Sequence, residues 1–287
     1  MPRGETQRIT AFIHACYEIL VQIQPASVRA VAYQLFIHKL LASMSKADTN
    51  KVSAHLVTAR KDGRIPWEWI VDETREPDRP GTWADAETYL HWTMQLYKRD
   101  RWTTQPHRVE VWSEKNTVRG TLAPVLEQFG VLYRPMHGFT SWTCSHEAVE
   151  DWRRDPKPTT VLYVGDWDPS GAYMSEVDLP QSHLQGVAVD IRRLAIVAEE
   201  ARRTSLPAFP ASDKAHDTRY PWWQRRGYGD TCWELDAMNP VDLRTVVQAA
   251  IEAYIDWDAW LRADEVEAAE QRSMRAFLRA WQRRQTG

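Results

Sequence analysis

The chain has 287 residues and carries 36 Lys and Arg against 39 Asp and Glu, a net charge of −3. This length is enough for two domains, each with its own core. Three cysteines without metal-type spacing argue against a disulfide framework and a structural zinc site, and they favour a reducing compartment. No apolar run approaches the roughly 20 residues that span a bilayer, so we expect a cytoplasmic protein without a membrane partner.

The charge is unevenly distributed along the chain. Residues 1–65 contain nine Lys or Arg and four acids, so this segment is +5 and the remainder is −8. A basic module joined to an acidic one is expected when one part holds nucleic-acid phosphates and the other holds cations. Ordinary scatter of surface charge is the alternative interpretation.

Three helices are predicted in the first 65 residues. Apolar residues recur at helical spacing over 9–23. A second helix, capped by Ser27, is expected to about Met44, and a third over 48–61. The aromatic-rich segment 65–70 suits a short hairpin or an extended arm. Together these elements predict a winged-helix (CAP-like) domain, which we expect over residues 1–103.

The third helix of a winged-helix domain usually enters the major groove of DNA. We therefore expect its cations to contact DNA, mostly at phosphates. These cations are Lys46, Lys51, Arg60 and Lys61. A solvated basic face that meets no nucleic acid is the alternative.

The second predicted domain, residues 104–287, alternates strands and helices. This alternation predicts a mainly parallel sheet flanked by helices, an α/β domain in a chain that is α+β overall. The tail is expected to be helical, with one apolar stripe suited to core or dimer contacts. The expected elements are a linker at 76–82, a helix from Thr82 to about Trp102, strands at 108–112, 131–134 and 160–165, helices at 115–129 and 145–153, and a tail at 257–284 with Met274, Phe277, Leu278 and Trp281 on its stripe.

Two of these strands end in carboxylates. Glu114 follows the strand at 108–112, whereas Asp166 and Asp168 follow the strand at 160–165. Because the carboxyl ends of parallel strands form the ligand-binding edge of a sheet, we expect the three carboxylates to converge there. Such oxygen ligands suit Mg²⁺, with Mn²⁺ as a substitute. In the alternative, Asp168 only caps the helix that Pro169 opens.

These motifs resemble the TOPRIM domain shared by topoisomerases, primases and some nucleases. The matching features are the Glu after one strand and the Asp-x-Asp after a later one. Further strings resemble the A subunit of topoisomerase VI and its relatives, which include the meiotic break-forming transesterases and the stand-alone Mini-A proteins of bacteria, phages or mobile elements. The strings are Gly-Asp-Trp-Asp-Pro-Ser-Gly at 165–171, Ser-Val-Arg-x-x-x-Tyr at 27–33 and Glu-Leu-Asp-Ala at 234–237, and the likeness covers about 27 to 255.

The resemblance implies that Tyr33 is the catalytic tyrosine, one helical turn after Arg29. A guanidinium at that spacing could favour the phenolate and bind the attacked phosphate, because a tyrosine with a pKa of about 10 needs such help. Apolar residues share the helix face of Tyr33, so burial in a core is the alternative. Lys115, Lys214 and Arg219 are expected to contact phosphate.

The implied activity is that of a DNA-binding, Mg²⁺-dependent transesterase. It would make double-strand breaks in duplex DNA through a 5′-phosphotyrosyl link, as a homodimer, with Glu114 among the catalytic residues. No Gly-Lys-Ser/Thr phosphate loop is visible, so we expect no ATP site in this chain; a separate B-type subunit would supply the ATPase. Two alternatives are a hydrolytic TOPRIM nuclease, in which Tyr33 is structural, and a non-catalytic DNA-binding recombination factor.

Overall fold

The structure is a computed structural model, and it describes residues 3–71, 81–136, 142–181, 187 and 189–285. The chain divides into two compact units. The first consists of residues 1–74 and 109–253, and the second of residues 75–108 and 254–287. This division differs from the expected boundary near residue 104, because the strand at 26–27 and the helices at 28–37 and 3–23 contact helical elements of the later segment, at 116–129, 235–237 and 240–252 respectively. Whether residues 1–103 fold independently stays a prediction.

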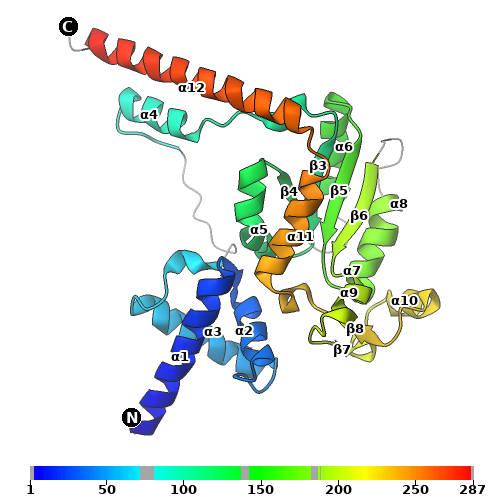
Figure 1. Ribbon diagram of the computed structural model, residues 1–287. Coiled ribbons are helices and arrows are strands. Elements are labelled where there is room, and N and C mark those ends of the chain that lie inside the picture. Colours follow the sequence, from blue (N-terminus) through cyan, green and yellow to red (C-terminus); the bar gives the residue numbers. More distant parts are fainter. Residues whose placement is uncertain (1–2, 72–80, 137–141, 182–186, 188, 286–287) are drawn as a thin grey trace. The chain divides into compact units, whose positions relative to one another are not determined.

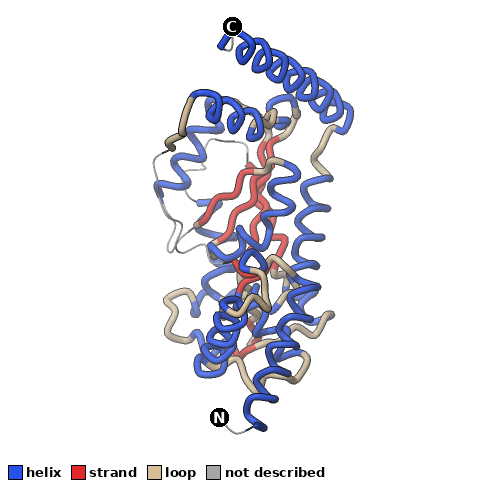
Figure 2. The backbone as a smooth tube through the Cα atoms, turned by 90° about the vertical axis from the view of Figure 1, so that its left-hand side faces the viewer, coloured by secondary structure: helices blue, strands red, loops and turns tan. Residues whose placement is uncertain are grey.

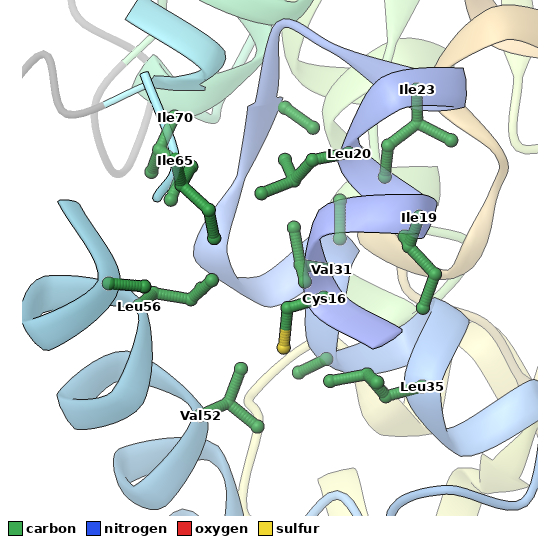
Figure 3. Close-up of a cluster of buried hydrophobic side chains, with 14 of the residues drawn as sticks. Cys16, Ile19, Leu20, Ile23, Val31, Leu35, Val52, Leu56, Ile65 and Ile70 are labelled. Atoms are coloured by element: carbon green, nitrogen blue, oxygen red, sulfur yellow. The ribbon is translucent and has the colours of Figure 1, made fainter. Parts of the chain in front are cut away.

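Three helices open the first unit: α1 (Arg3–Ile23), α2 (Val28–Ile37) and α3 (Lys46–Lys61). They share a hydrophobic core, in which Cys16 and Leu20 of α1 meet Leu35 of α2 and Leu56 of α3 (Figure 3). The helical spacing of apolar residues in the sequence therefore corresponds to the buried face of α1.

The second helix ends earlier than the sequence suggests. Ser27 caps α2 as expected, since its Oγ accepts the backbone N–H of Ala30 at 3.0 Å. The helix stops at Ile37 rather than near Met44 because Lys39 adopts a left-handed conformation with φ of 59°. The N–H of residue 40 then bonds back to the carbonyl of residue 35 at 2.8 Å, which closes the helix end.

The segment after α3 was expected to form a short hairpin or an extended arm. It forms a 3₁₀ turn, η1 (Trp67–Trp69), and a short strand, β2 (Ile70–Val71). This strand pairs in parallel with β1 (Ala26–Ser27). Residues 72–80, which would complete a wing and include most of the expected linker, lie outside the described residues, so the winged-helix assignment stays a prediction.

A four-stranded sheet forms the centre of the first unit (Figure 2). Its order is β4 (Leu132–Pro135), β3 (Arg108–Ser113), β5 (Thr159–Val164) and β6 (Val189–Ala195). β4 runs parallel to β3, and β6 runs parallel to β5. The three expected strands are confirmed to within a residue or two at their ends. The fourth strand, β6, was not expected, because its charged residues break the apolar pattern.

Helices cover both faces of this sheet (Figure 1). On one face, Trp112 of β3 and Tyr163 of β5 pack against Trp152 of α6 and Met174 of the following helical segment. On the other face lie α5 and α11, which also contact each other. The helices are α5 (Asn116–Phe129), α6 (Trp142–Arg154), α7 (Pro169–Tyr173), the π-helical η4 (Met174–Asp178), α8 (Leu179–Gln181), α9 (Ala198–Arg203) and α11 (Pro240–Glu252).

Shorter elements connect β6 to α11 beside the carboxyl edge of the sheet. They are β7 (Phe209–Pro210), η5 (Ala211–Lys214), α10 (Tyr220–Arg226), β8 (Thr231–Cys232) and η6 (Leu235–Ala237). β7 and β8 pair antiparallel. The main chain of Trp167, in the loop after β5, bonds to that of Trp233, so this connection is joined to the loop that carries the candidate ligands.

The second unit consists of α4 (Ala86–Leu96), the 3₁₀ turn η3 (Arg101–Thr104) and one long helix, α12 (Trp257–Gln285). Helix α4 is capped by Asp85, not by Thr82, and ends before the expected Trp102. The residues of the expected apolar stripe do not share one environment: Leu278 is buried, whereas Phe277 is 63% exposed. In the described parts of the chain, every helix is too short or too polar to cross a lipid bilayer.

Candidate active site

The strand order reverses between β3 and β5. β4 lies on the outer side of β3, and β6 lies on the outer side of β5. In open α/β sheets, ligands bind outside the carboxyl ends of the strands at such a reversal. Glu114 follows β3, and Asp166 and Asp168 follow β5. The three predicted metal ligands therefore come from the two strands that border this point.

Asp168 is 2% exposed and fixes the turn between β5 and α7. Its Oδ1 accepts the backbone N–H of Gly171 at 2.9 Å, so it is the N-cap of α7, in the way that the capping interpretation expects. Its Oδ2 lies 2.8 Å from Nζ of Lys214. Asp168 thus has a structural role and also presents an oxygen to a cation.

Asp166 has two partners at the same oxygen. Its Oδ1 accepts the backbone N–H of Leu235 at 2.7 Å and lies 2.8 Å from Nζ of Lys115. The Lys115 ammonium also lies 3.0 Å from Oδ2 of Asp236. Burial would lower the pKa of Lys115, but the two carboxylates raise it above its ordinary value. Lys115 is therefore a permanent positive charge between the two acids.

Glu114 has a raised pKa. Burial, together with the nearby Asp166 and Asp168 carboxylates, raises its pKa from 4.5 to about 7. Like charges oppose each other's ionisation at short range, and a divalent cation relieves this repulsion. The pKa of Glu114 therefore indicates that the three carboxylates share one electrostatic environment.

A buried hydroxyl beside this cluster supports binding of a hydrated ion. Tyr163 is fully buried, and its hydroxyl has no hydrogen-bond partner among the described residues. Burial and then the Glu114 carboxylate raise its pKa, which places the group beside the cluster. Buried polar groups of this kind are usually satisfied by an ordered water or ion. The carboxylate donors and this hydroxyl together fit a hydrated Mg²⁺.

Two lysines pair with the carboxylates at this edge. Within residues that the structure describes, no group of three His, Cys, Asp or Glu side chains stands close enough to hold a metal. Ammonium groups of Lys115 and Lys214 pair with Asp166 and Asp168 instead. A cation at this edge would share its carboxylates with these lysines.

A second cluster connects this edge to α2. The Nε of Arg29 donates to Oε2 of Glu234 at 2.6 Å. Ser27 Oγ donates to Oδ1 of Asp236 at 3.0 Å, while Lys115 holds Oδ2 of the same carboxylate. The Glu-Leu-Asp string at 234–236 therefore joins the start of α2 to the acidic edge.

Tyr33 lies on α2 one turn after Arg29 and is 5% exposed. The Arg29 guanidinium lies 5.6 Å from the centre of its ring. Burial, followed by the Glu234 carboxylate, raises the pKa of Tyr33 above its ordinary value; Arg29 acts in the opposite direction and is outweighed. Arg29 therefore favours the phenolate, as expected, but burial and the Glu234 carboxylate outweigh its effect in this arrangement.

The other predicted DNA contacts of the first unit lie on α3. They are Lys46, Lys51, Arg60 and Lys61. Val52, Leu56 and Ala59 bury the opposite face of this helix. Arg60 stacks over the ring of Trp67 at 4.1 Å, so this arginine is held beside η1. The cations of α3 do not join the acidic cluster, and their contact with DNA stays a prediction.

The remaining predicted phosphate ligands have acidic partners within the chain. Lys115 and Lys214 pair with the candidate metal ligands, as described above. Nη1 of Arg219 lies 3.4 Å from Oδ1 of Asp217. Phosphate contact by any of the three would require it to leave or share its present carboxylate.

Arg193 of β6 is a site residue that the sequence did not reveal. Its guanidinium donates to the carbonyl oxygens of Gly165 at 3.2 Å and Asp166 at 3.1 Å, to that of Gly171, and to Oγ of Ser175 at 3.0 Å. It therefore braces both ends of the loop that carries Asp166 and Asp168. Nothing in the sequence distinguishes it from the neighbouring Arg192, which is exposed.

A comparison with models of known protein families finds no match to this chain, and neither does a comparison with curated proteins. The family resemblance therefore stays a prediction that depends on the motifs.

Proposed function

We propose that the chain is a Mg²⁺-dependent, DNA-cleaving transesterase that resembles the topoisomerase VI A subunit, with Tyr33 as the nucleophile. One observation carries the proposal: a continuous set of hydrogen bonds and ion pairs runs from the N-cap of the tyrosine helix to the acidic edge. It passes from Ser27 to Asp236, then to Lys115 and to Asp166. A purely structural tyrosine helix would not need polar coupling to this edge.

The residues of the edge have separable roles in this proposal. Glu114, Asp166 and Asp168 would hold Mg²⁺, which when bound neutralises phosphate charge and steadies the leaving oxygen. When DNA binds, Arg29 leaves Glu234 and pairs with a phosphate oxygen. The Glu234 carboxylate is then without its guanidinium partner and can act as a base beside Tyr33.

The transesterification balances with groups of this chain, DNA and water. Oη of Tyr33 forms a bond to phosphorus, and the bond from phosphorus to the 3′-oxygen breaks. The tyrosine proton passes to Glu234, and the 3′-oxygen takes a proton from water. The products are a 5′-phosphotyrosyl link and a free 3′-hydroxyl, so the bond energy is retained and the break is reversible.

Two copies would be needed for a double-strand break, so we propose a homodimer acting on duplex DNA. Strand passage would require an ATPase on a separate B-type subunit. The N-terminal cations on α3 would hold the duplex through its phosphates.

The test is covalent trapping on DNA. Purified full-length protein is mixed with end-labelled and supercoiled duplexes and Mg²⁺ or Mn²⁺, then quenched with detergent. We expect protein on 5′ ends for wild type and for Tyr17→Phe, an exposed tyrosine on α1 that serves as the control, and no link for Tyr33→Phe. Asp166→Asn should bind DNA without cleaving it.

A hydrolytic nuclease is the second candidate, and the burial and raised pKa of Tyr33 favour it. In that case water replaces the tyrosine, and Tyr33→Phe cleaves DNA as well as wild type does, without a covalent link. Loss of cleavage in Asp166→Asn would be common to both candidates.

A further inference from the structure

The carboxyl-terminal half of α12 carries charge of one sign. Residues 271–285 contain five Arg and no Asp or Glu, a local charge of +5 in a chain whose net charge is −3. All five guanidinium side chains are exposed. This is the same net charge as that of residues 1–65, in about a quarter of the length.

Four of these arginines lie on one side of the helix. They are Arg272, Arg275, Arg279 and Arg283, at intervals of three and four residues. Such intervals align side chains along one helix face. Eleven residues at a rise of 1.5 Å per residue extend this row over about 16 Å. We call these four residues the arginine row.

The two halves of α12 use their charges differently. In the first half, Glu270 pairs with Arg99 at 2.7 Å, and Glu267 lies 3.3 Å from Arg101. These acids fix the helix to the segment around η3. In contrast, Arg272, Arg275 and Arg279 form no ion pair within the described part of the chain. These three arginines are therefore not needed to hold α12 in its unit.

The apolar side chains of this half of the helix limit the kind of partner. Met274 and Leu278 face a groove beside Leu90 and Met94 of α4, and Leu278 is 5% exposed. A helix that lies in a membrane surface needs an open apolar face beside its basic one. Within residues 271–285, Phe277 is the one exposed large apolar side chain, whereas Trp257, Leu261 and Val266 are exposed in the first half of the helix. The chemistry of the row fits a hydrophilic polyanion with regularly spaced charges.

We propose that the arginine row binds the phosphate backbone of duplex DNA, as a contact additional to α3. The inference rests on the proposed function only in taking duplex DNA as the partner. Guanidinium groups suit phosphate oxygens because their donors form a planar fork. Contacts to phosphates position a duplex without reading its sequence, so the row adds affinity and salt dependence but no sequence preference.

The test measures DNA affinity against salt concentration for a triple variant, Arg272→Gln, Arg275→Gln and Arg279→Gln. A fluorescent duplex is titrated in EDTA, and the Tyr33→Phe background prevents cleavage. The matched control replaces three exposed arginines elsewhere, Arg153, Arg154 and Arg203, by Gln. Both variants change net charge equally, and circular dichroism and thermal melting establish that both are folded.

We expect the row variant to bind DNA about tenfold or more weakly than wild type. The magnitude of the slope of log K against log salt should fall by about 2.7, because each of the three lost phosphate contacts contributes about 0.9. The control should keep the wild-type slope. Equal slopes for the two variants would overturn the inference. The inference would also be overturned if the row variant kept its DNA affinity but no longer bound phosphatidylserine vesicles, because the partner would then be a membrane.

Failure of this inference is distinguishable from failure of the proposed function. If the wild type cleaves DNA and the row variant has an unchanged salt slope, the arginine-row inference fails and the proposed transesterase activity stands. If the row variant has a reduced slope but the wild type forms no covalent link, the arginine-row inference stands and the proposed activity fails.

Discussion

The Nζ of Lys115 lies 2.8 Å from Oδ1 of Asp166 and 3.0 Å from Oδ2 of Asp236, and all three side chains are largely buried. This ammonium joins a residue that follows β5 to a residue of η6, directly beside Glu114. The pairing makes the acidic edge stable without a metal, and it also holds the segment to which Arg29 and Ser27 bind.

Replacement of this ammonium should be costly. Lys115→Met leaves Asp166 and Asp236 without their shared cation, and breaking a buried pair typically lowers the free energy of unfolding by about 3 kcal/mol. Urea denaturation measures the loss. Lys157→Met, which removes a pair with the exposed Asp155, is the control and should cost less than about 1 kcal/mol. Because Mg²⁺ would supply the missing positive charge, we expect it to stabilise Lys115→Met more than wild type; equal stabilisation would argue against metal at Asp166.

The raised pKa of Glu114 predicts an unusual pH dependence of the metal-free protein. Between pH 4.5 and about 7 the folded state keeps the Glu114 proton, whereas the unfolded state has lost it. The free energy of unfolding contributed by this group therefore falls as pH rises through that window. Glu114→Gln should remove this part of the slope.

Denaturation midpoints in EDTA across this pH range measure the effect of Glu114. The exposed Glu127 on α5 provides the control, since Glu127→Gln should follow wild type. Identical pH profiles for Glu114→Gln and wild type would show that the carboxylates do not interact.

Gly171 is required by a close approach of two backbone segments. A Cβ atom at this position would overlap the carbonyl oxygen of Asp166. Gly171→Ala should therefore shift the loop between β5 and α7 and destabilise the fold by about 1–3 kcal/mol. Thermal melting checks this, with the adjacent Ser170→Ala as a control that should be nearly neutral. A Gly171→Ala protein as stable as that control would contradict the geometry.

Arg193 should be a positioning residue for the metal ligands. Arg193→Lys keeps the charge but cannot reach the carbonyls of Gly165 and Asp166 together with Ser175. We expect weaker Mg²⁺ binding by calorimetry, by about tenfold, with the fold retained. Arg192→Lys is the matched control because this neighbour is exposed and pairs with Asp190. An effect of equal size in both variants would exclude a specific brace.

Much of the fold follows from periodicity in the sequence. The buried face of α1 is an apolar pattern of helical period, and β5 is a short run of buried apolar and Thr residues, so burial favours both elements. The end of α2 could not be predicted, because Lys39 takes a left-handed conformation that usually marks glycine. The strand β6 was hidden because it is half exposed and carries Arg193.

The positions of the three candidate carboxylates were predictable from the sequence, and their partners within the chain were not. Glu114, Asp166 and Asp168 stand at strand ends, where topology alone brings them together. The pairing of Lys115 with Asp236 depends on a contact across more than a hundred residues of sequence, which no local pattern encodes. The same holds for Glu234, which raises the pKa of Tyr33 and so opposes the effect of Arg29.

The central claim is that Tyr33 itself becomes bonded to DNA, and the most direct measurement is to map the link. Trapped complexes are digested with nuclease and trypsin and analysed by mass spectrometry. Cleavage after Arg29 and Lys39 releases the peptide 30–39, in which Tyr33 is the one tyrosine. We predict that this peptide carries a nucleotide attached through a 5′-phosphate. Two results would contradict the account. One is that the 30–39 peptide carries no nucleotide although DNA has been cut in the presence of Mg²⁺, and the other is that the nucleotide is found on another peptide.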